Sequence, residues 1–96
     1  MFTFSRRAAN DLVEIATYTR EAWNEAQARK YLSQLENTCL QLAGNPFLGR
    51  TCDHIKPGLR RLECESHVVF YRLHSSGILV VRILHERMLP NLHSLE

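Results

Sequence analysis

The sequence has no uninterrupted apolar run of eighteen residues, so we expect no membrane-spanning helix. Its first residues, MFTFSRRAAND, contain no apolar run ahead of a cleavage site, so we expect no secretory signal peptide. Cysteine is scarce, and the three cysteines are odd in number and scattered, which does not suit a disulfide framework. These absences together favour a cytoplasmic protein with free thiols.

The sequence also lacks the patterns that usually carry metal or catalytic chemistry. The segments CDH (52–54) and CESH (64–67) contain suitable ligand types, but neither has the paired Cys or His spacing of a structural zinc site. We find no Ser/His/Asp set, carboxylate pair or glycine-rich phosphate loop in the sequence. We therefore expect neither a bound metal nor a cofactor.

Neither sign of charge is in large excess, and the formal net charge is +2. Residues 1–44 carry five Lys or Arg and five Asp or Glu, whereas residues 45–96 carry seven and five. The second half is therefore mildly basic. Such a surface is compatible with an acidic protein or a nucleic acid as a partner, but it is too weak to demand one.

Residues that favour β-strands are concentrated in the second half of the chain. The runs VVFY (68–71) and ILVV (78–81) are separated by HSSG (74–77), and so short a polar interruption predicts a hairpin. A weaker strand is expected over residues 59–65. Both strong runs are apolar at odd and even positions, which is typical of strands covered on both faces. The sheet therefore needs a layer packed on it.

The first half of the chain supplies this layer as two helices. Ser5 and Asn24 are suited to N-cap positions, and Gln27 follows Asn24 at the spacing of a capping box. Apolar residues recur at intervals of three and four through residues 6–23 and 25–43, as on one face of a helix. Because the joint between the helices is very short, we expect them to be antiparallel neighbours.

The chain is long enough for one domain over residues 1–96. The order β-α-α-β-β-β predicts an α+β fold, with an N-terminal strand and an α-helical hairpin packed on an antiparallel sheet. The expected parts are a strand at 2–4, the helical hairpin at about 6–43, a loop at 44–58, the C-terminal sheet at 59–85 and a tail at 86–96.

Basic residues gather in the loop and the sheet. Two of them, Arg72 and Arg82, interrupt apolar strands, and whether they share a face depends on the hairpin register, which the sequence leaves open. For any single arginine, an ion pair with a nearby glutamate is the simpler interpretation. His85 closes the last strand; it suits either a hydrogen-bonded structural role or proton transfer in a nucleolytic site.

Several short motifs occur in a fixed order between about residues 4 and 88. They are Ala8, Asp11, Leu12 and Ile15; Gln27, Ala28 and Tyr31; Leu42, Ala43 and Pro46; Gly49 and Arg50; Gly58, Leu59 and Arg60; residues 66–72 (SHVVFYR); and residues 82–85 (RILH) with Met88. In this order and at this spacing, the motifs resemble the RelE/ParE toxin superfamily of bacterial toxin–antitoxin modules. The resemblance is closest to the ParE branch.

The resemblance implies a cytoplasmic toxin that a cognate antitoxin holds inactive, in a hetero-oligomer of the two. ParE-like members poison DNA gyrase, whereas RelE-like members cut messenger RNA on the ribosome. The nuclease branch places basic residues where this sequence has Val68 and Leu59, and that departure favours a gyrase inhibitor without catalytic residues. Two alternatives stay open: a RelE-like ribosome-dependent endoribonuclease, and a degenerate homologue that binds only its antitoxin.

The resemblance and the residue types together suggest three sets of site residues. For gyrase, the expected target-binding residues are Arg60, Arg61, Arg82, Arg87, Met88 and Leu89. For the antitoxin, the expected contacts are Trp23, Tyr31, Leu59 and Arg72. If the protein is instead a nuclease, the expected catalytic residues are Arg61, His85 and Arg87.

Overall fold

A computed structural model describes residues 1–87 of the chain. It confirms the α+β class and the expected order of the main elements. One short strand, β2, lies in the segment that was expected to be a loop. In chain order the elements are β1 (Phe2–Phe4), α1 (Arg6–Ala22), α2 (Glu25–Gly44), β2 (Arg50–Thr51), β3 (Arg60–Cys64), β4 (His67–His74) and β5 (Gly77–His85).

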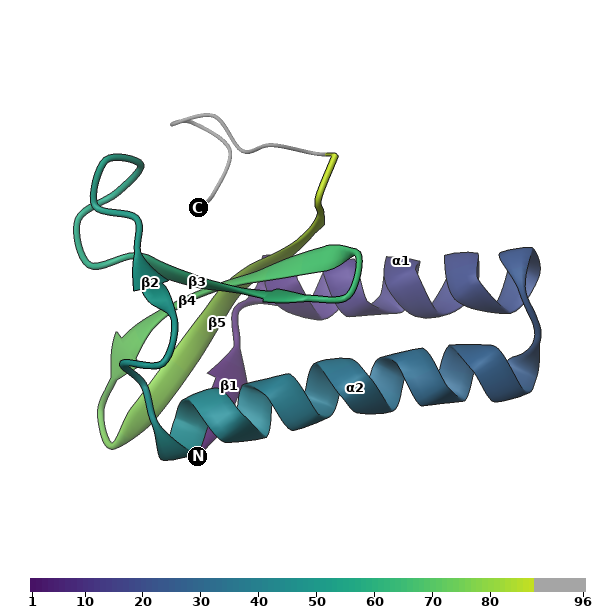
Figure 1. Cartoon of the computed structure of the whole chain (residues 1–96), viewed down its shortest axis with the longest axis horizontal. Coiled ribbons are helices and arrows are strands. Elements are labelled where there is room, and N and C mark those ends of the chain that lie inside the picture. The colour runs from purple at the N-terminus through teal and green to yellow at the C-terminus, as the bar shows by residue number, and fades with distance from the viewer. Residues whose placement is uncertain (88–96) are drawn as a thin grey trace.

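The two helices form the expected antiparallel hairpin and lie side by side along the sheet (Figure 1). Both predicted caps are confirmed: the Ser5 hydroxyl accepts a hydrogen bond from the Ala8 backbone N–H at 3.0 Å, and the Asn24 side chain accepts one from the Gln27 N–H at 2.8 Å. Neither helix combines the length and the apolar character needed to cross a bilayer.

The strands form one five-stranded sheet in the order β1-β5-β4-β3-β2. Strands β2 to β5 pair antiparallel, but β1 pairs parallel to β5, with Phe2 opposite Ile78. The sheet is therefore mixed, whereas an antiparallel sheet was expected. A tight turn fixes the antiparallel direction of a hairpin. The two helices and three further strands separate β1 from β5 in the sequence, so no turn constrains the direction of β1.

An irregularity in the β4–β5 pairing settles the register that the sequence left open. Phe70 pairs with Arg82, and Arg72 pairs with Leu79. The step from the first pair to the second covers two residues in β4 but three in β5. Strand β5 therefore contains one extra residue, a β-bulge, between these pairs. Arg72 is exposed, whereas the side chain of Arg82 is largely buried, so the two arginines occupy different surroundings.

Both faces of the sheet carry an apolar cluster, as the uninterrupted apolar strands predicted. On the helix side, the buried cluster consists of Ala8, Ile15, Tyr31, Leu35, Cys39, Leu42, Cys64, Val69, Tyr71, Ile78, Val80 and Ile83. On the outer side, a smaller cluster consists of Cys52, Leu59, Val68, Phe70, Val81 and Leu84, with Ile55 of the 52–59 loop packed against it. The loop thus covers part of the face that the helices leave open.

Candidate functional site

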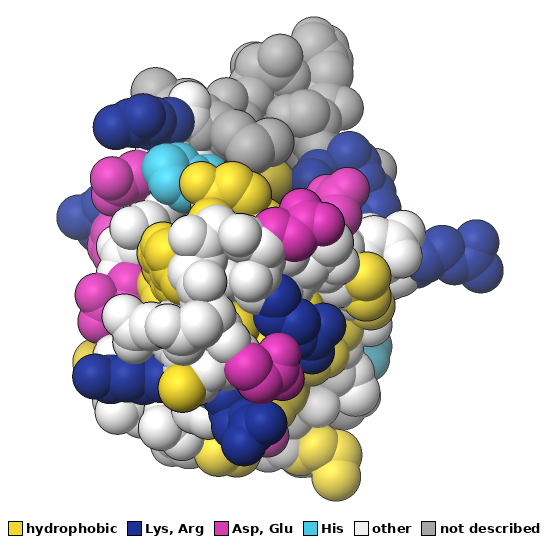
Figure 2. Space-filling model, turned by 90° about the vertical axis from the view of Figure 1, so that its right-hand side faces the viewer, with side chains coloured by type: hydrophobic (Ala, Val, Ile, Leu, Met, Phe, Trp, Pro, Cys, Tyr) yellow, Lys and Arg dark blue, Asp and Glu magenta, His cyan; other side chains and the backbone are white. Residues whose placement is uncertain are grey.

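A groove of about 370 Å³ lies between α1 and the ends of β4 and β5. Figure 2 faces the end of the molecule that carries the α1–α2 turn, and there histidine and hydrophobic side chains adjoin one another with acidic side chains around them. The groove is lined by Asp11, Glu14, Ile15, Tyr18, Thr19, Trp23, Tyr31, Ser66, His67, Arg82, Ile83, Leu84 and His85.

Four ring side chains along this groove form a continuous row across four parts of the fold. Trp23, at the end of α1, meets Tyr31 of α2 edge to face, with ring centroids 5.6 Å apart. Tyr31 meets His67 of β4 at 5.4 Å, and His67 meets His85 of β5 at 5.3 Å. Edge-to-face contacts of this kind are favourable beyond the area that they bury, so the row joins the helical hairpin to the sheet.

Tyr31 and His67 form a hydrogen-bonded pair at the centre of the row. The Tyr31 hydroxyl accepts the Ser66 backbone N–H at 3.1 Å and is hydrogen-bonded to Nδ1 of His67. Burial lowers the pKa of His67, and the neighbouring His85 lowers it further. Burial likewise raises the pKa of Tyr31. A neutral His67 whose Nδ1 accepts a hydrogen bond from the protonated Tyr31 hydroxyl is consistent with all three observations.

A buried ion pair forms part of the groove wall. Arg82 of β5 donates from Nε to Oδ2 of Asp11 at 2.8 Å and from Nη2 to Oδ1 at 3.0 Å. The same carboxylate accepts the backbone N–H of Ile83 at 2.9 Å. The hydrogen bond to Asp11 raises the pKa of Arg82, so its charge is fixed and locally compensated. Arg82 was expected to bind a target, but its guanidinium is hydrogen-bonded to Asp11 of α1.

The structure does not bring together the residues expected for a nuclease. The side chains of residues paired across neighbouring strands project on the same face of the sheet, and successive side chains along one strand project on alternate faces. His85 pairs with His67, which contacts Tyr31 on the helix side. Arg61 pairs with Phe70, which lies in the outer cluster, and its guanidinium lies 5.6 Å from the Phe70 ring centroid. His85 and Arg61 therefore face opposite sides of the sheet.

The two positions at which the sequence departs from the nuclease branch meet in the same apolar cluster. Val68 is 5% exposed and Leu59 is 3% exposed, and both lie in the outer cluster. The structure thus gives these positions a packing role. Leu59 was expected to contact an antitoxin, but its side chain is not on the surface of the described chain, because the 52–59 loop turns it inward.

The basic residues expected to form one patch are separated. Arg60 and Arg61 are consecutive in β3, so their side chains project on opposite faces. Arg61 pairs with Glu63 at 2.7 Å, and so does Arg50 of β2 at 2.6 Å. Strand β4 lies between β3 and β5, and Arg87 is exposed just after the end of β5. The expected target contacts Met88 and Leu89 lie outside the described residues.

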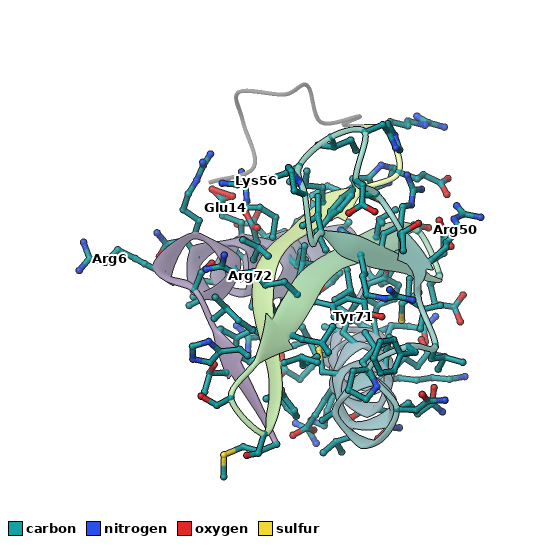
Figure 3. The ribbon with its side chains drawn as sticks, turned by 90° about the vertical axis from the view of Figure 1, so that its left-hand side faces the viewer. Arg6, Glu14, Arg50, Lys56, Tyr71 and Arg72 are labelled. Atoms are coloured by element: carbon teal, nitrogen blue, oxygen red, sulfur yellow. The ribbon has the colours of Figure 1, made fainter. Side chains whose placement is uncertain are left out.

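Two of the expected antitoxin contacts do meet in the groove. Trp23 is 49% exposed and Tyr31 is 7% exposed, and their rings are in contact. Arg72 lies elsewhere, on the exposed part of β4 (Figure 3). Glu14 and Tyr18 also line the groove from α1, although neither was predicted to be a site residue. The sequence does carry a signal for them: Glu14 follows Asp11 by three residues and Tyr18 follows Glu14 by four, so all three project from one side of α1.

With its helical hairpin on a five-stranded mixed sheet, the chain falls in a class of small α+β proteins that includes a solved toxin–antitoxin structure. It superposes on a chain of the "Chromosomal ParDE TA system from P. aeruginosa" with a TM-score of 0.75, covering 88% of this chain and 92% of that one at 24% identity. At that level of identity the match concerns the fold alone.

Sequence similarity then defines the family. A family model described as "ParE toxin of type II toxin-antitoxin system, parDE" matches residues 2–90. The chain is 42% identical over 88 residues to Toxin ParE1 of Mycobacterium tuberculosis, covering 91% of this chain and 90% of that protein. It is 36% identical over 92 residues to Toxin ParE1 of Caulobacter vibrioides (96% and 95% covered) and 39% identical over 89 residues to Toxin ParE of Escherichia coli (91% and 85% covered). The chain belongs to the ParE toxin family of type II toxin–antitoxin systems.

Proposed function

We propose that this ParE-family toxin stops growth by binding and inhibiting DNA gyrase in the cytoplasm, and that a cognate antitoxin neutralises it. The observation that carries the proposal is the separation of His85 and Arg61 onto opposite faces of the sheet. Cleavage of RNA needs a proton donor or acceptor and cations that converge on one phosphate. A toxin whose described residues lack that convergence acts more simply by binding.

The outer cluster supports the same proposal. A nuclease would need cations where Val68 and Leu59 pack together, and each of these side chains is at least 95% buried among apolar neighbours. Placing a charge there would cost several kcal/mol unless a partner compensated it. These positions on the outer face of the sheet are therefore suited to packing, not to binding a phosphate.

We infer that the antitoxin occupies the groove between α1 and the ends of β4 and β5. The groove combines an exposed aromatic side chain, Trp23, with the Tyr31 hydroxyl and the carboxylate of Glu14. Amphipathic segments commonly bind such grooves through apolar anchors, with basic residues meeting the acidic rim. Binding that favours the folded state also stabilises the toxin.

The first test is which process stops when the protein is produced without antitoxin. We expect DNA synthesis, measured by thymidine incorporation, to fall before protein synthesis, measured by methionine incorporation, together with induction of the SOS response. Co-production of the antitoxin should prevent both effects. Immediate loss of protein synthesis would support the nuclease alternative and contradict the proposal. Unchanged growth at verified expression would identify a degenerate homologue.

A further inference from the structure

Two large apolar side chains are exposed together at the turn between α2 and β2. Phe47 is 66% exposed and Leu48 is 48% exposed, and we call this pair the 47–48 tip. The tip lies at the opposite end of α2 from Trp23, which precedes the helix. Since α2 has 20 residues, the tip and Trp23 are separated by about 30 Å along its axis. The tip is also absent from the lining of the groove.

Tyr71 fixes the backbone on both sides of the tip. Its hydroxyl donates to the Pro46 carbonyl oxygen at 2.7 Å and accepts the Gly49 backbone N–H at 2.9 Å. Tyr71 is fully buried, and Figure 3 shows it inside the fold, between the sheet and α2. A Cβ atom at Gly49 would lie 2.4 Å from the Tyr71 hydroxyl, so this approach requires glycine.

Arg60 fixes the same turn from β3. Its Nη2 donates to the Gly49 carbonyl oxygen at 2.7 Å and to the Phe47 carbonyl oxygen at 3.3 Å. Its guanidinium also lies 5.3 Å from the centroid of the Phe47 ring. Within the turn, the Leu48 N–H donates to the Asn45 carbonyl oxygen at 3.0 Å. The turn is therefore ordered by contacts from two strands, while its apolar side chains remain in solvent.

An ordered apolar tip suits binding because little conformational freedom remains to be lost when a partner meets it. Exposed aromatic and aliphatic residues in fixed positions are typical anchors of protein interfaces. The surface beside the tip is positive, since Arg50 and Arg61 share the single carboxylate of Glu63. The side chain of Arg50 is 68% exposed and lies at the outer edge of the sheet (Figure 3).

We propose that the 47–48 tip is the anchor through which this toxin binds its protein target, by insertion into an apolar pocket with an acidic rim. This inference rests on the proposed function in assuming that the toxin acts by binding a target. It adds where that contact lies and what chemistry the target presents. It also separates the target contact from the groove, so that the antitoxin and the target meet opposite ends of α2.

The test compares the double variant Phe47→Ser/Leu48→Ser with Leu40→Ser, whose side chain is 54% exposed on α2. Each variant and the unaltered chain are produced from a titratable promoter, and growth arrest, thermal melting and antitoxin affinity are measured. We expect the tip variant to need at least tenfold more protein for arrest, with its melting temperature and antitoxin affinity unchanged. The Leu40→Ser control should arrest growth as the unaltered chain does.

Equal toxicity of the tip variant and the unaltered chain would overturn the proposal, as would a loss of antitoxin binding that accompanies the loss of arrest. Growth arrest can be measured without knowing the target. The assay of the tip variant therefore tests the tip as the target contact independently of whether the target is gyrase. If the tip variant loses toxicity while the unaltered chain leaves gyrase active, the tip is supported as the target contact and gyrase is rejected as the target. Toxicity that depends on Arg50 but not on the tip would point to a nucleic acid and overturn the proposal.

Discussion

Asp11 and Arg82 join the two halves of the fold, although they are 71 positions apart in the sequence. The side chains are only 9% and 12% exposed, and the carboxylate also accepts the backbone N–H of Ile83. Asp11 of α1 thus accepts hydrogen bonds from both a side chain and a backbone N–H of β5. This pair also forms part of the wall of the groove that we assign to the antitoxin.

Replacing Asp11 by Ala should destabilise the protein by about 3–5 kcal/mol, because a largely buried Arg82 would lose its counter-charge. The measurement is the free energy of unfolding from urea titration. The matched control is Glu25→Ala, which removes an exposed ion pair with Arg20 and should cost less than about 1 kcal/mol. Similar losses of unfolding free energy in both variants would mean that the Asp11–Arg82 pair contributes no more to stability than an exposed ion pair.

Local signals explain why much of the fold was predictable. The caps at Ser5 and Asn24 and the helical periodicity depend on residues a few positions apart, and both helices were placed correctly. The parallel pairing of β1 and the bulge in β5 depend on contacts between distant segments, so the sequence alone did not give them. The relative positions of Arg72 and Arg82 depend on the bulge, so they could not be fixed from the sequence.

The site was predictable in the same limited way. Trp23 and Tyr31 were expected to bind a partner, and the structure places them in one groove because the helical hairpin brings the end of α1 beside the start of α2. Ser66, on the turn into β4, and His67, the first residue of β4, contact Tyr31 only through tertiary packing. That turn could not be positioned from sequence spacing.

Core packing yields a second prediction. Leu35 is 1% exposed and Ile83 is 2% exposed, and both belong to the cluster between the helices and the sheet. Substituting either by Ala should lower the free energy of unfolding by about 2–5 kcal/mol. Gln41→Ala, on the exposed side of α2, should change it little. Comparable effects at buried and exposed positions would contradict this assignment of the core.

The groove yields a third prediction. Trp23→Ala should weaken antitoxin binding by about 2 kcal/mol, or roughly thirtyfold in Kd, if the indole is a central anchor. The assay is calorimetry with the cognate antitoxin. Leu40→Ala removes a comparably exposed apolar side chain outside the groove and serves as the control. Equal affinities for Trp23→Ala and the unaltered toxin would place the antitoxin elsewhere.

Stability should depend on pH through His67. Its pKa in the folded protein is lowered from 6.5 by burial and by His85, whereas Asp11 and Glu86 oppose the shift. The unfolded chain therefore binds more protons below pH 6.5, so the contribution of His67 is complete above that pH and is lost as pH falls through the folded pKa. We expect the urea midpoint to decrease from pH 7 to pH 5, and to decrease less in His67→Gln. An identical pH profile for the variant would assign the effect to other groups.

Inhibition of gyrase by purified toxin tests the central claim most directly. Supercoiling of relaxed plasmid is followed as toxin is added, with and without antitoxin, beside a ribosome-programmed assay of messenger RNA cleavage. We expect supercoiling to stop, antitoxin to restore it, and message to stay intact. His85→Gln should inhibit as the unaltered chain does, because binding needs no proton transfer. Cleaved message with unaffected gyrase would contradict the account.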